Sequence, residues 1–158
     1  MVLTPTGLRF MGRKFPCTIG KTGLTTTKAE GDGATPRGIH QIVALLYRPD
    51  RMARPTPWAT PILPGDLWSD ASGQPDYNTH VRAPYAYSHE SLRRADPLYD
   101  LVLVTDWNWP IAQPGRGSAI FIHQWRRPGY PTEGCIAFRR DHLNWIARNA
   151  PPGTAIHA

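Results

Sequence analysis

One histidine and one cysteine in this sequence have the types and surroundings of a base and a nucleophile. His123 closes an apolar run, and Cys135 follows Gly134 twelve residues later, at the start of another short apolar segment. A cysteine reacts as the thiolate, so a catalytic cysteine needs a base or a positive environment that lowers the pKa of its thiol from about 8.5. The alternative is that both side chains are packing residues, because small cysteines between apolar neighbours are often buried.

Gly134 has a mechanical reason to precede a nucleophile. Without a Cβ it lets a substrate approach the backbone, and the N–H groups around Gly134 and Cys135 can point at a developing oxyanion. If the segments that carry His123 and Cys135 are neighbouring strands, both side chains project at the same rim. An activated thiol then predicts that Cys135 reacts faster than Cys17 near neutral pH.

Strands are the elements expected to position this pair. Alternating or continuous apolar runs rich in β-branched and aromatic residues predict strands at 13–20, 39–47, 99–107 and 118–124, with an edge or closing strand at 154–158. A turn-rich segment at 30–38 leads into the second of these runs. The Pro-rich stretch from Arg48 to Gly73 is typical of a long, ordered, irregular loop.

Helical signals occur at two places. Ser88 is a plausible N-cap for a short helix in the segment SHESLRRA, although Ser91 stands where a capping box has Glu. In DHLNWIARN, Leu143, Ile146 and Ala147 share one helical face. The pattern therefore predicts a mostly β (α+β) domain with one or two short packed helices.

Length and composition favour one globular domain over residues 1–158. A chain of 158 residues with 41% hydrophobic residues can bury a single core, and 17 Pro and 14 Gly imply many turns. No window approaches eighteen consecutive apolar residues, and the N-terminus shows no signal-peptide pattern, so no membrane insertion and a cytoplasmic location are expected. A chain trimmed of a leader would look the same and be periplasmic.

Charge and ligand spacing exclude other classes of protein. The formal net charge of +6 favours anionic partners, but the basic residues are scattered and no nucleic-acid-binding signature is present. The two cysteines and six histidines show none of the spacings typical of zinc ligands, so neither a metal nor another cofactor is expected.

Two segments resemble the active-site signature of the YkuD-type L,D-transpeptidase catalytic domain family. These are GSAIFIH and PTEGCIAF, and the upstream EGDGATPRG resembles the Thr-Pro-x-Gly turn of that family. The resemblance spans most of the chain and implies a two-sheet β-sandwich with small helices. It further implies that Cys135 is the nucleophile, that His123 is the base, and that the amides of Gly134 and Cys135 form the oxyanion hole.

The motif departs from the common form of the family in two positions. Thr132-Glu133-Gly134-Cys135-Ile136-Ala137 stands where Ser-His-Gly-Cys, a hydrophobic residue and Arg or Asn are common, so Glu133 replaces a second histidine and Ala137 a polar residue. The base assigned by resemblance, His123, is retained. The departures therefore bear on the substrate and the acceptor.

The resemblance implies a peptidoglycan substrate. Family members attack the bond between the third residue of a stem tetrapeptide, commonly diaminopimelate, and the fourth, D-alanine, and form a thioester. Because no export signal is seen, the expected activity is that of an L,D-carboxypeptidase on soluble muropeptides, as in recycling. The alternatives are an L,D-transpeptidase, which cross-links third residues or exchanges D-amino acids, and an inactive wall-binding module. No oligomeric state is indicated.

Residues near the motif are candidates for binding that substrate. Stem peptides carry several carboxylates, which a guanidinium group can bind in bidentate fashion. Arg116 is the preferred carboxylate ligand and Asn108 a weaker one, while Thr132 and Glu133 are expected along the substrate path. The alternatives are that Arg116 is a solvated surface residue and that Glu133 belongs to a surface turn. Further residues are expected in loops that could roof the cleft: Tyr77, Asn78, His89 and Glu90.

Overall fold

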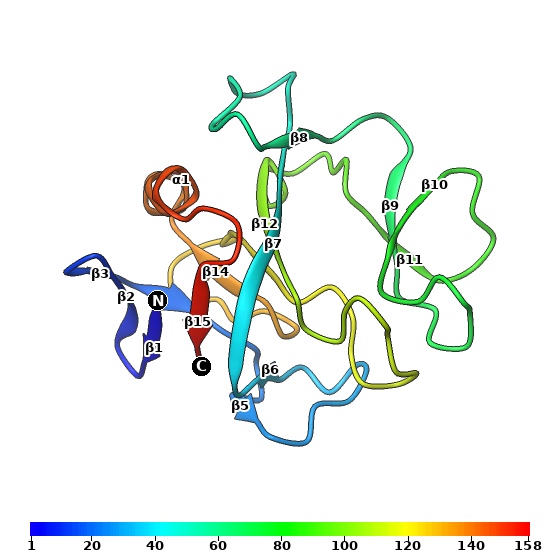
Figure 1. Ribbon diagram of the computed structural model, residues 1–158, viewed down its shortest axis with the longest axis horizontal. Coiled ribbons are helices and arrows are strands. Elements are labelled where there is room, and N and C mark those ends of the chain that lie inside the picture. The colour runs from blue at the N-terminus through cyan, green and yellow to red at the C-terminus, as the bar shows by residue number, and fades with distance from the viewer.

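The computed structural model describes residues 1–158, and strands dominate it (Figure 1). The prediction of a mostly β fold with short packed helices is confirmed, with one helix. The strands form a ten-stranded, a three-stranded and a two-stranded sheet.

The large sheet contains, in spatial order, β3 (Arg13–Phe15), β2 (Gly7–Phe10), β1 (Val2–Thr4), β15 (Ala155–His157), β7 (Ile39–Tyr47), β12 (Leu101–Thr105), β13 (Phe121–Gln124), β14 (Ile136–Phe138) and β4 (Cys17–Thr18), with β8 (Thr60–Pro61) beside β7. The three-stranded sheet is β10 (His80–Arg82), β9 (Asp66–Ser69) and β11 (His89–Ser91), and β5 (Leu24–Thr25) pairs with β6 (Thr35–Pro36). The helix is α1 (Arg140–Asn149).

The centre of the large sheet is buried on both faces, which explains the continuous apolar run of β12. Leu101 and Leu103 face the core beneath α1, whereas Val102 and Val104 face a second core that contains Trp68 of β9. Accordingly, α1 and the three-stranded sheet flank the central strands on opposite sides (Figure 1). The second core thus joins the two sheets that frame the site described below.

Strands β13 and β14 are parallel neighbours, so the condition for bringing the histidine and the cysteine to one rim is met. Ile122 lies opposite Ile136, and both belong to the core beneath α1. Side chains alternate along a strand, so Phe121 and His123 point to the other face. Cys135, directly before β14, packs against the core on that same face.

Three expectations about local structure are wrong. The segment from Ser88 is not a helix: His89–Ser91 form β11, which pairs with β9 and so outweighs a weak capping signal that lacked its Glu. The strand predicted over 13–20 is divided at Pro16, which has no N–H to donate. The loop predicted from Arg48 to Gly73 contains β8 and β9.

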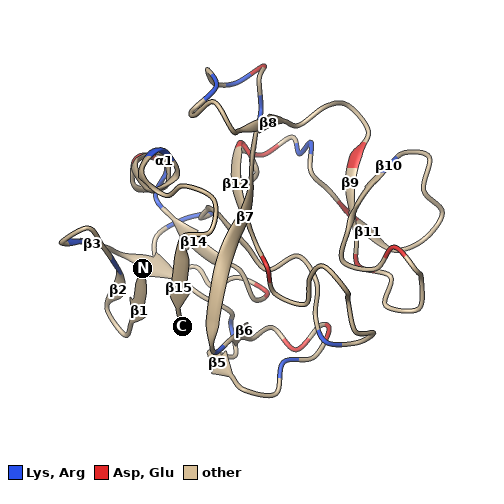
Figure 2. Ribbon diagram, viewed as in Figure 1, with Lys and Arg blue, Asp and Glu red and all other residues tan.

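The second predicted helix is confirmed as α1, in which Leu143, Ile146 and Ala147 are buried. This ten-residue helix is the only one in the structure, and it is too short and polar to cross a membrane. The final strand, β15, is not at an edge, because it lies between β1 and β7 and so ties the N-terminal hairpin to the sheet. Lys and Arg are distributed over several elements rather than gathered on one (Figure 2).

Candidate active site

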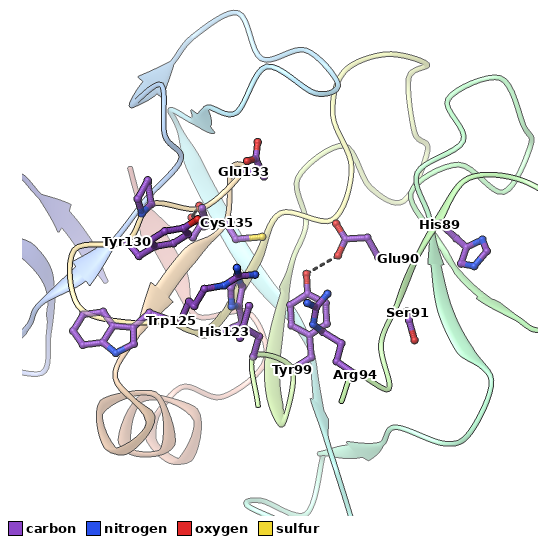
Figure 3. Close-up of a pocket in the computed structure, with 14 residues that line it drawn as sticks. His89, Glu90, Ser91, Arg94, Tyr99, His123, Trp125, Tyr130, Glu133 and Cys135 are labelled. Carbon is purple, nitrogen blue, oxygen red and sulfur yellow. Dashed lines mark hydrogen bonds between the residues drawn. The ribbon is translucent and has the colours of Figure 1, made fainter. Parts of the chain in front are cut away.

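A cavity of about 620 Å³ lies where the end of β13 and the start of β14 meet β11 and the segment that follows it (Figure 3). One wall is the loop between the two large-sheet strands, and the opposite wall comes from β11 and the chain up to Tyr99. The cavity is lined by His89, Glu90, Ser91, Arg94, Leu98, Tyr99, His123, Trp125, Arg126, Tyr130, Pro131, Thr132, Glu133 and Cys135.

The Cys135 thiol is held between two backbone groups. Its S–H donates to the carbonyl of Ala119, with 3.1 Å between sulfur and oxygen, and its sulfur accepts from the N–H of Phe121 at 3.4 Å. Burial, followed by the negative charge of Glu90, raises the pKa of this thiol to about 12. The expectation of a lowered thiol pKa is therefore wrong for the substrate-free protein, in which Cys135 is protonated at neutral pH.

His123 has the form required of a base. Its side chain is almost fully buried, and Nδ1 lies 2.8 Å from the carbonyl oxygen of Gln124. A carbonyl can only accept, so Nδ1 carries the hydrogen and Nε2 is left free to take a proton. Burial lowers the pKa of His123 to about 4. The rings of His123 and Tyr99 pack edge to face, with 5.2 Å between the ring centres. The imidazole is thus neutral and fixed in orientation at neutral pH.

The turn before Cys135 requires glycine at Gly134. Its φ is 145°, and a Cβ at this position would lie 2.8 Å from the carbonyl oxygen of Ala34. The Thr132 hydroxyl accepts from the Gly134 N–H at 3.2 Å and donates to the Cys135 carbonyl at 2.6 Å. Thr132, expected to bind substrate, therefore also holds the turn.

One amide of the predicted oxyanion hole is free and the other is engaged. The Gly134 N–H is bound to the Thr132 hydroxyl, whereas the Cys135 N–H makes no hydrogen bond within the protein. An unpaired N–H on the residue that carries the sulfur is a suitable donor to an oxyanion formed by attack of that sulfur. The turn is anchored further by Thr35, whose hydroxyl donates to the Gly134 carbonyl at 2.7 Å.

Two residues outside the cavity support the site in ways that the sequence did not predict: Thr35, and Asn78, which was expected only in a loop over the cleft. Thr35 lies in the segment EGDGATPRG, whose resemblance to the Thr-Pro-x-Gly turn of the family gives this threonine no individual role. Asn78 is 2% exposed, and its side-chain oxygen accepts from the Ala119 N–H and from Trp68 Nε1, each at 3.0 Å. Since Ala119 adopts a left-handed φ of 51°, Asn78 holds the strained residue whose carbonyl receives the Cys135 thiol.

Two of the predicted substrate ligands lie outside the cavity. Arg116 is exposed, stacks over Trp107 at 5.6 Å and donates to the Gln113 side chain. Asn108 is engaged with the backbone of Gln113 and Gly117, so it closes the same loop. Neither lines the cavity.

Two other arginines, Arg94 and Arg126, supply the positive charge of the cavity. The guanidinium of Arg94 lies 5.2 Å from the centre of the Tyr99 ring and binds both carboxylate oxygens of Asp96. Glu133 lines the rim, with its side chain 77% exposed and paired to Lys21 at 2.7 Å.

Cys135, directly before β14, and a neutral His123 on the adjoining β13, with a free amide beside the sulfur, have the parts required for cysteine-dependent acyl transfer. The sequence matches the family model of the L,D-transpeptidase catalytic domain (YkuD) over residues 8–157. No curated protein and no solved structure gives a significant match. Since the family match covers nearly the whole chain, this protein belongs to the YkuD family of L,D-transpeptidase catalytic domains.

Proposed function

We propose that this member of a peptidoglycan-modifying family is an L,D-carboxypeptidase that removes D-alanine from the stem tetrapeptides of soluble muropeptides. The observation that carries the proposal is the placement of Cys135 and His123 on one wall of a single cavity (Figure 3). The family acts on peptidoglycan, which supports the substrate class. The expected cytoplasmic location stays part of the proposal.

The first half of the reaction forms a thioester. The Cys135 thiol leaves its Ala119 acceptor and gives its proton to Nε2 of His123, and the thiolate attacks the carbonyl carbon of the third stem residue. The oxyanion accepts a hydrogen bond from the Cys135 N–H. When the tetrahedral intermediate collapses, the C–N bond breaks and His123 returns the proton to the amine of the departing D-alanine.

The second half consumes water. His123, neutral again, takes a proton from a water molecule that attacks the thioester carbonyl, and the tripeptide leaves with a new carboxyl group. The Cys135 sulfur recovers its proton from His123, which restores the starting state.

Hydrolysis is proposed over transfer because of the residues that differ from the common family motif. An acceptor amine arrives as an ammonium and must lose a proton before it attacks, whereas water arrives neutral. The second histidine of the common motif is replaced by Glu133, which is paired with Lys21. Ala137 replaces the polar residue. The motif therefore offers an acceptor amine no second imidazole.

The test is to incubate the protein with a disaccharide tetrapeptide, with and without excess D-methionine, and to weigh the products. Loss of one alanine alone supports the carboxypeptidase, and exchange of D-alanine for D-methionine indicates transpeptidation instead. Cys135→Ala should abolish either product, while Cys17→Ala serves as the matched control. Unchanged substrate with the wild-type protein would overturn both activities.

A further inference from the structure

The carboxylate of Glu90 faces the nucleophile from the opposite wall of the cavity. Glu90 is the central residue of β11, and its side chain points toward the sulfur of Cys135 (Figure 3). The Tyr99 hydroxyl donates to Glu90 Oε2 at 2.5 Å and so fixes the carboxylate in this position. The strand and the tyrosine thus present a negative charge to the reacting atom.

Glu90 forms no ion pair in the structure. The nearby Arg94 binds Asp96 through both carboxylate oxygens, and Glu133 at the cavity rim is paired with Lys21. Burial raises the pKa of Glu90, as do the charges of Asp70 and Glu30, while the Tyr99 hydrogen bond and Arg94 act in the opposite direction. A half-buried carboxylate without a cation can bind one strongly.

The Glu90 carboxylate also disfavours the thiolate form of Cys135, which the proposed reaction requires. Its negative charge is, after burial, the largest cause of the raised pKa of the Cys135 thiol, since a second negative charge on sulfur is disfavoured. A cation bound to Glu90 would cancel that repulsion. Because the cavity supplies no such cation at Glu90 itself, the substrate is the available source.

We propose that Glu90 binds a primary ammonium group of the peptide substrate, and that this ammonium compensates the charge which Glu90 presents to Cys135. The inference rests on the proposed function and names the part of the substrate that activates the site. A third stem residue with an amine in its side chain, such as diaminopimelate, carries this ammonium on the residue whose carbonyl is attacked. Binding of the correct peptide thereby favours the thiolate.

The binding test uses the Cys135→Ala protein, which cannot consume the ligand. Two disaccharide tetrapeptides are compared by calorimetry, one with the free side-chain amine of diaminopimelate and one with that amine acetylated. The free amine is expected to bind on the order of tenfold more tightly, and Glu90→Gln should reduce this ratio to about one. Asp141→Asn, which changes an exposed carboxylate outside the cavity, should keep the ratio.

The reactivity test needs no substrate. In a Cys17→Ala background, alkylation of Cys135 by iodoacetamide at pH 8 should be several-fold faster with Glu90→Gln than with Glu90, because removing the charge lowers the pKa of the thiol. Asp141→Asn, which changes an exposed carboxylate outside the cavity, should leave the alkylation rate unchanged. A rate that does not respond to Glu90→Gln would overturn the coupling between Glu90 and Cys135.

The outcomes separate this inference from the proposed function. Equal affinities for the two peptides, or a ratio that persists in Glu90→Gln, overturn the role of Glu90 even if D-alanine is released. Failure to release D-alanine overturns the carboxypeptidase, while the affinity ratio still decides whether an ammonium is bound at Glu90. If Glu90→Gln does not fold, the ratio measured with Glu90 in place decides alone, and a value near one refutes the inference.

Discussion

The buried imidazole of His123 predicts a loss of stability in a defined range of acid pH. Its pKa is lowered from 6.5 to about 4 by burial. Between pH 6.5 and about 4 the unfolded chain takes up a proton that the folded protein does not, so the free energy of unfolding declines progressively over this range and levels off below it. The free energy of unfolding should fall by about 2 kcal/mol between pH 7 and pH 5, and by about 3 kcal/mol by pH 4.

Urea unfolding at pH 7, 5 and 4 measures this contribution. His123→Asn removes the titrating group, so its free energy of unfolding should fall less than that of the wild type by these amounts. The carboxylates titrate in both proteins, so their contributions to the free energy of unfolding cancel in the difference between them. His157→Asn changes an exposed histidine on β15 and should retain the wild-type decline. An identical decline in wild type and His123→Asn would refute the assignment of a buried, neutral imidazole.

Two further substitutions test the support of the nucleophile. Gly134→Ala is expected to cost about 1–3 kcal/mol and to block D-alanine release, because its φ of 145° is strained for alanine and the Cβ would meet the Ala34 carbonyl; wild-type stability in urea would contradict this. Asn78→Ala leaves the buried N–H groups of Ala119 and Trp68 without their acceptor and should cost about 2–4 kcal/mol. Asn78 Nδ2 also donates to the carbonyl oxygens of Trp107 and Asn108, so Asn78→Asp, which lacks these donors, should not recover the stability. Wild-type stability of Asn78→Ala in urea would contradict a contribution from these hydrogen bonds.

The parts of the fold that the sequence predicts correctly are those set by local pattern. The apolar run over β12 and the helical face of Leu143, Ile146 and Ala147 are readable without knowledge of the neighbours, because periodicity alone specifies them. The helix expected from Ser88 failed because β11 exists only through its pairing with β9, some twenty residues earlier in the chain.

The candidate site likewise contains residues that the local sequence pattern reveals and contacts that only the folded chain reveals. Cys135, His123 and Gly134 lie in one short stretch, and their residue types carry the chemistry. Asn78 contacts Ala119, which is 41 residues away in sequence, so only the folded chain reveals this contact.

The place of Arg116 close to β13 in the sequence favours it as a ligand, but in the folded chain it lies over Trp107 and does not line the cavity. The raised thiol pKa was equally hidden, since it depends on burial and on Glu90 across the cavity.

The most direct test of the central proposal is the mass of the protein during turnover. The Cys17→Ala protein is mixed with disaccharide tetrapeptide, quenched in acid within the first turnovers and weighed intact. The account predicts an adduct with the mass of the substrate less D-alanine, located on Cys135 after digestion and absent from the Cys135→Ala protein. Release of D-alanine by a protein that lacks Cys135 would contradict the account.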